Sequence, residues 1–106
     1  EYPIRLEKGS RAAALYGKNL VVERHRHRYE VNPKYHAALT RAGLVLSGRM
    51  AGDKRLVEFI EIPSHSFFIA TQAHPEFSSR FMRQHPLFLG LIDAAVKEKG
   101  AQKKLA

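Results

Sequence analysis

Two apolar stretches in the middle of the chain, at residues 56–62 and 67–71, constrain the fold most strongly. In the first stretch, alternate side chains fall on opposite faces of an extended strand, and both faces are largely apolar. In the second stretch, a continuous apolar run ends at Thr71. A strand that is apolar on both faces requires cover on both sides, as in a sheet packed between layers of helices. The two stretches therefore predict a domain of the α/β class.

Capping and turn residues divide the rest of the chain into short elements. Ser10 and Asn32 are suited to begin helices, and Gly17 and Gly43 are suited to end them. Pro86 is suited to the first turn of a last helix, and the charged tail that follows is expected to fray. The expected helices occupy residues 11–16, 34–42 and 86–97. The expected strands occupy residues 20–22, 44–48, 56–62 and 67–71, with another near the start of the chain. Because short turns join the middle strands, we expect these to be antiparallel.

Length and composition limit the class of protein. A chain of 106 residues forms at most one domain or a part of one. It begins without Met inside an expected strand, so we expect a further segment upstream. No apolar run reaches the length of a membrane span, and the first residues lack the apolar core of a signal peptide. The absence of cysteine excludes disulfides and cysteine-ligated metals, and it fits a reducing compartment such as the cytoplasm.

His74 and Glu76 form the clearest candidate catalytic pair. They lie two residues apart, directly after the second apolar stretch, so in extended chain both side chains point to the same side. A carboxylate in that position can accept a hydrogen bond from one imidazole nitrogen, and the other nitrogen can then exchange a proton with a nucleophile. Pro75 stiffens the link between them. The alternative is a surface pair that arises by chance in a chain with 6 histidines.

A basic segment at residues 23–30 is the second candidate site. In a strand its three arginines would share one face, where they would bind carboxylate or phosphate groups. The net charge of +8 also suits a nucleic-acid binder, although no interleaved aromatic platform accompanies the arginines. Two further alternatives are an edge strand protected by its charge and a metal site formed by His25 and His27, for which no third ligand is evident. His85 precedes the last expected helix and is suited to cap it.

Taken together, these motifs resemble the class I glutamine amidotransferase domain of CTP synthases. The resemblance covers nearly the whole chain, and the basic segment is its most specific part. Matching residues lie at 23–33, 42–44, 47–48, 56–58, 60–61, 70–77, 79–80 and 85–88. The resemblance implies the C-terminal portion of a flavodoxin-like three-layer α/β domain, with antiparallel strands and a C-terminal helix, spanning residues 1–106 as a partial domain.

The resemblance also implies roles for individual residues. A cysteine thiolate attacks the side-chain amide of glutamine, His74 transfers protons, and Glu76 orients His74. Arg28 would bind the α-carboxylate of glutamine, and the backbone at Tyr29 would help to hold this substrate. The cysteine and the synthetase domain would lie upstream of residue 1, so residues 1–106 alone are not expected to hydrolyse glutamine.

For the parent protein, the resemblance implies a ligase that aminates UTP to CTP with ammonia from glutamine. It implies ATP and Mg²⁺ in the synthetase domain, GTP as activator, and a homotetramer. No cofactor or metal is expected within these residues, and no membrane partner. The alternatives are a basic module that binds nucleotides or nucleic acid, an amidotransferase that serves GMP or anthranilate synthesis, and a degenerate relative without catalysis.

Overall fold

A five-stranded antiparallel sheet forms the centre of the chain, in the order β2-β1-β3-β4-β5. The structure, a computed structural model, describes residues 2–24 and 30–105, with side chains described as far as residue 100. The strands are β1 (Tyr2–Leu6), β2 (Leu20–Glu23), β3 (Val45–Met50), β4 (Val57–Glu61) and β5 (Ile69–Thr71). The helices are α1 (Arg11–Tyr16), α2 (His36–Arg41) and α3 (Pro86–Leu105), with 3₁₀ turns η1 (Pro33–Tyr35) and η2 (Pro75–Phe77).

The α/β class, the antiparallel middle strands and the C-terminal helix are confirmed. Strand β4 is buried on both faces, as its apolar pattern predicts, since Val57, Glu58 and Phe59 are each at most 2% exposed. The prediction of a buried strand at residues 67–71 is wrong in extent and burial. Strand β5 covers only Ile69–Thr71, lies at the edge of the sheet and is half-buried. Among residues 2–24 and 30–105, no strand pairs with the outer side of β5, so that side is not protected from water by a neighbouring strand.

Helix α1 begins and ends where its capping residues predict. The Ser10 side chain accepts a hydrogen bond from the Ala13 N–H, and Gly17 ends the helix with a positive φ of 72°. Glu61 of β4 adds a second cap that the sequence did not reveal. Its carboxylate accepts hydrogen bonds from the N–H groups of Arg11 at 2.8 Å and Ala12 at 3.2 Å. A carboxylate at this end also interacts favourably with the helix dipole, so α1 is fixed onto the sheet.

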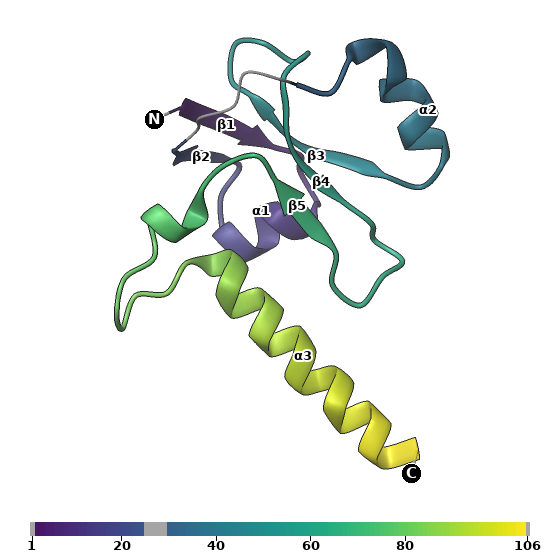
Figure 1. Ribbon diagram of the computed structural model, residues 1–106, viewed down its shortest axis with the longest axis vertical. Coiled ribbons are helices and arrows are strands. Elements are labelled where there is room, and N and C mark those ends of the chain that lie inside the picture. Colours follow the sequence, from purple (N-terminus) through teal and green to yellow (C-terminus); the bar gives the residue numbers. More distant parts are fainter. Residues whose placement is uncertain (1, 25–29, 106) are drawn as a thin grey trace.

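Two helix boundaries differ from the sequence-based expectation. Asn32 does cap the backbone, since its side chain accepts a hydrogen bond from the Lys34 N–H at 3.0 Å. The first turn is nevertheless the 3₁₀ turn η1, and α2 is limited to His36–Arg41, because tighter turns are common at helix starts. At the other end of the chain, α3 continues to Leu105, where fraying was expected. In Figure 1 its C-terminal half extends away from the sheet.

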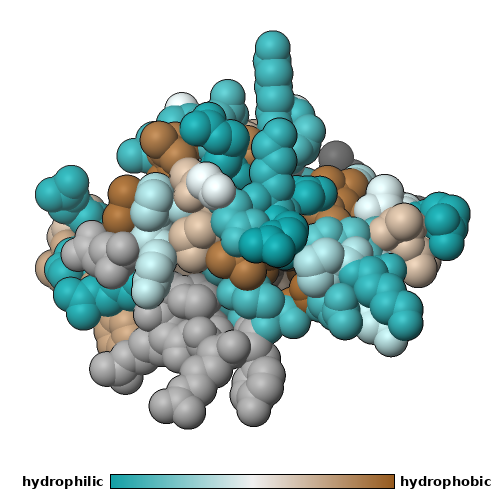
Figure 2. Space-filling view, turned by 90° about the horizontal axis from the view of Figure 1, so that it is seen from above, coloured by the Kyte–Doolittle hydropathy of each residue, from teal (hydrophilic) through white to brown (hydrophobic). Residues whose placement is uncertain are grey.

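The hydrophobic core lies between the sheet and helix α1. Ile4, Leu6, Val21 and Phe59 from three strands pack with Ala12 and Ala13 of α1, and with Ala73 and Leu87. Helix α3 approaches α1 closely at Gly90, where an added Cβ would lie 2.7 Å from Cδ2 of Leu15. The view from above in Figure 2 shows a largely hydrophilic face with hydrophobic groups in separate patches. Larger apolar side chains are exposed along α3, among them Leu89, Leu91, Ile92 and Val96.

Gly48 is the position where the packing of β3 on β4 tolerates no side chain. A Cβ added there would lie 2.7 Å from Cδ1 and 2.8 Å from Cβ of Phe59, which is fully buried. Gly48→Ala is therefore expected to destabilise the fold by about 1–3 kcal/mol. Gly100→Ala is the matched control, because nothing lies within 4 Å of the added Cβ and alanine favours helix. Equal thermal midpoints for the two variants would contradict this account of Gly48.

Candidate functional site

The turn that follows β5 presents the candidate catalytic pair. Thr71 ends the strand, and its hydroxyl accepts a hydrogen bond from the Ala73 N–H at 3.0 Å. His74 then precedes the 3₁₀ turn η2, in which Pro75 occupies the first position and is buried. The buried proline anchors the turn, while the side chain of Glu76 remains exposed on its outer side. The pair is thus carried by a short anchored turn at the edge of the sheet.

His74 and Glu76 do contact each other, but through the 3₁₀ turn η2 and not through the extended chain assumed from their spacing. Nδ1 of His74 lies 2.8 Å from Oε1 of Glu76, and the side chains are 29% and 53% exposed. The hydrogen bond from His74 lowers the pKa of the Glu76 carboxyl below its ordinary value. Because an ionised carboxylate only accepts hydrogen bonds, Nδ1 carries the proton and Nε2 is the basic nitrogen. This tautomer is the one that a general base oriented by a carboxylate requires.

Contacts of His74 and Phe77 hold the turn against Arg24, the residue that follows β2. The Phe77 ring lies beside the His74 ring, with centroids 5.5 Å apart. The Arg24 guanidinium lies 5.7 Å from the Phe77 centroid, within the range of a cation–π interaction. The backbone N–H of His74 donates to the carbonyl of Arg24 at 3.0 Å. The turn that carries the candidate pair and the start of the basic segment, far apart in sequence, are therefore in direct contact.

Residues 25–29 of the basic segment lie outside the described part of the structure. These include Arg28 and Tyr29, expected to bind glutamine, and His25 and His27, considered as metal ligands. Their roles stay predictions. Across residues 2–24 and 30–105, no group of three or more metal-ligating side chains comes together. Nor is any helix in that part of the chain long and apolar enough to cross a membrane.

Glu23, the first residue of the basic segment, is buried at the centre of a hydrogen-bond network that sequence reasoning missed. It is 2% exposed and accepts hydrogen bonds from Tyr16 Oη at 2.5 Å, from Ser78 Oγ at 3.0 Å and from Nε2 of His85. Burial on its own would raise the pKa of Glu23, but the bonds from His85, Tyr16 and Ser78 lower it on balance. The one feature of the sequence that could have indicated this role is the acidic Glu23 directly before a run of arginines.

A second buried carboxyl group lies near the other end of the basic segment. Glu58 of β4 is 1% exposed. Burial first, and then the charge and hydrogen bond of Glu30, raise the pKa of Glu58 to about 8. Gln72 joins the group, because its Nε2 donates to Oε2 of Glu30 at 3.2 Å. Glu30, Glu58 and Gln72 thus connect the end of the basic segment to β4 and to the chain entering the turn that carries His74 and Glu76.

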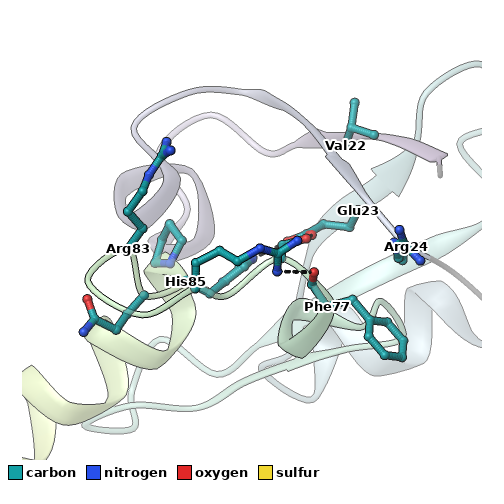
Figure 3. Close-up of a pocket in the computed structure, with 10 residues that line it drawn as sticks. Val22, Glu23, Arg24, Phe77, Arg83 and His85 are labelled. Carbon is teal, nitrogen blue, oxygen red and sulfur yellow. Dashed lines mark hydrogen bonds and ion pairs between the residues drawn. The ribbon is translucent and has the colours of Figure 1, made fainter.

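A pocket of about 630 Å³ opens beside the turn. Its walls include Glu23 and Arg24 on one side, Phe77 near them, and Arg83 and His85 opposite (Figure 3). His74 and Glu76 do not line this pocket, so it adjoins the pair and does not contain it. Arg80 donates a hydrogen bond to the Phe77 carbonyl at 2.8 Å, which holds together two residues of the pocket wall.

Comparison with known proteins agrees with this geometry. The family model for class-I glutamine amidotransferases matches residues 2–94, so the chain belongs to that family. Within the family it is similar to CTP synthases. It is 55% identical over 104 residues to the CTP synthase of Synechococcus sp. (strain JA-3-3Ab) and 57% identical over 98 residues to that of Methanocaldococcus jannaschii. These matches cover 98% and 92% of the chain but only 19% and 18% of the two relatives.

A solved structure gives the same assignment. The fold matches the glutaminase domain of the Trypanosoma brucei CTP synthase, solved with bound acivicin, with a TM-score of 0.84 and 46% sequence identity. The match covers 91% of this chain and 38% of that one. The expected resemblance is therefore confirmed, and the basic nucleic-acid module is not favoured.

Proposed function

We propose that these residues form the C-terminal part of the glutaminase domain of a CTP synthase. In this proposal the parent protein hydrolyses glutamine and uses the ammonia for the ATP-dependent amination of UTP to CTP. The observation that carries it is the 2.8 Å contact between His74 and Glu76, on a turn whose backbone bonds to the basic segment. High identity to CTP synthases over nearly the whole chain supports the same parent.

Glutamine hydrolysis assigns a distinct task to each residue of the pair. A cysteine, supplied by a part of the parent outside residues 1–106, passes its thiol proton to Nε2 of His74, and the resulting thiolate adds to the side-chain carbonyl carbon of glutamine. As the carbon–nitrogen bond breaks, His74 delivers a proton to the departing ammonia and a thioester forms. His74 then takes a proton from water as the water attacks the thioester, which releases glutamate and the thiolate. Glu76 holds the His74 ring in the required tautomer.

Glutamine recognition is assigned to the basic segment. The guanidinium of Arg28 would bind the α-carboxylate of glutamine, because its planar pair of donors matches a carboxylate. The backbone at Tyr29 would hold the rest of the substrate. The synthetase domain, its ATP and Mg²⁺, activation by GTP, a homotetrameric assembly and a cytoplasmic location are proposals for the parent protein on the same basis.

Two assays on the intact parent protein test the proposal. It should release glutamate from glutamine and form CTP from UTP with either glutamine or free ammonia as the nitrogen source. A polypeptide of residues 1–106 should release no glutamate, since it contains no cysteine. If the intact protein forms CTP from ammonia but never hydrolyses glutamine, the degenerate alternative is correct. If it does neither, the proposed function is wrong.

A further inference from the structure

Glu23 and Arg24 hold the catalytic turn at both of its ends. At the first end, the Arg24 carbonyl accepts a hydrogen bond from the His74 N–H at 3.0 Å. At the second end, Oε1 of Glu23 accepts a hydrogen bond from the Ser78 hydroxyl at 3.0 Å. The turn between these points contains both His74 and Glu76. Glu23, which ends β2, and Arg24, which follows it, therefore help to fix the turn relative to the sheet.

Other hydrogen bonds prevent the Glu23 carboxylate from moving. Its Oε2 accepts a hydrogen bond from the hydroxyl of Tyr16 in α1, at 2.5 Å. The same oxygen accepts a second hydrogen bond from the Nε2–H of His85. The state of His85 follows from its second nitrogen, because Nδ1 accepts a hydrogen bond from the Leu87 N–H at 3.1 Å. A nitrogen that accepts carries no proton, so His85 donates to Glu23 through Nε2. His85 thus caps the start of α3 and also orients Glu23.

The network of hydrogen bonds around the buried Glu23 carboxylate is more than the stability of the fold requires. A buried ionised group is expensive to desolvate, and apolar residues of similar volume often stabilise a core equally well or better. The Glu23 carboxylate is instead surrounded by donors from α1, from the catalytic turn and from the start of α3. Each contact also has a direction, which apolar packing lacks. A directional anchor is useful where a side chain beyond it must be held in one geometry.

We propose that Glu23 is a positioning residue for glutamine hydrolysis, acting through its hydrogen bond to Ser78 to hold the His74–Glu76 turn in its working geometry. This inference rests on the proposed function. Glu23 and Arg24 also begin the segment to which glutamine binding is assigned, and both contact the turn that carries His74. Displacement of a catalytic group by about 1 Å can lower a rate by about 10²-fold.

The test removes one contact from the exposed end of the network. Ser78→Ala in the intact protein deletes only the hydroxyl that joins the turn to Glu23, and Ser78 is exposed, so folding should be preserved. We expect kcat for glutamine hydrolysis to fall about 10–100-fold, while CTP formation from ammonia is unchanged. Ser78→Thr keeps a hydroxyl and should restore kcat. Ser64→Ala, the same change in an exposed loop, should match wild type.

The possible outcomes separate the two proposals. If wild type hydrolyses glutamine and Ser78→Ala retains its kcat, the positioning role of Glu23 is wrong and the proposed function stands. The role is also wrong if Ser78→Ala lowers ammonia-dependent synthesis and the thermal midpoint in parallel, or if Ser78→Thr fails to restore kcat. If wild type hydrolyses no glutamine at all, the proposed function itself fails.

Discussion

Replacing His74 with alanine is expected to lower glutamine-dependent CTP formation by the intact protein by about 10³-fold or more. Ammonia-dependent CTP formation should stay at the wild-type rate. Without the imidazole, no group at this position can protonate the departing ammonia or deprotonate the attacking water. Free ammonia needs neither step, so it bypasses the loss. Steady-state assays with the two nitrogen sources, on one preparation of the variant, give the comparison.

Two further variants make the His74 experiment specific. His65→Ala changes a histidine in an exposed loop, where Nδ1 accepts a hydrogen bond from the Phe67 N–H, and it should leave both activities unchanged. Glu76→Gln keeps the shape of the side chain but removes the charge that orients the ring, so it should impair only the glutamine-dependent reaction. Equal losses with glutamine and ammonia in His74→Ala would mean that His74 has a structural role.

Replacing Glu58 with glutamine is expected to stabilise the fold, and increasingly so as the pH rises. The Glu58 carboxyl has a pKa of about 8 in the folded chain, against 4.5 for an unperturbed group. Between these two values the folded state keeps a proton that the unfolded state releases, so the free energy of unfolding falls as the pH rises. Glutamine has the same shape and does not titrate, and it also removes the repulsion with Glu30.

Thermal unfolding at several pH values tests the role of Glu58. At pH 5 the midpoints of Glu58→Gln and wild type should be similar, and by pH 8 the variant should unfold roughly 10 °C or more above wild type. Glu7→Gln is the matched control, because Glu7 is exposed and should show no such divergence. A constant difference between Glu58→Gln and wild type across this range would show that the burial of Glu58 is not linked to proton binding.

Local features of the chain could be predicted because their causes lie within a few residues. The caps at Ser10 and Asn32 and the glycine that ends α1 depend on backbone groups close in sequence. The contact between His74 and Glu76 depends on their spacing of two residues and on the turn between them. His85 likewise caps α3 through a backbone N–H two residues away. The resemblance to CTP synthases came from the same kind of local motif and is confirmed.

The tertiary structure alone decided which distant segments meet. Strand β1 lies between β2 and β3, and β5 at the edge of the sheet, because strand pairing depends on contacts across the whole chain. The burial of Glu23 beside Ser78 and His85, which are 55 and 62 residues away, follows from that topology. The same is true of Glu58, whose polar side chain sits in an apolar strand. A sequence pattern shows what a residue can donate or accept, but only the fold shows which partner is within reach.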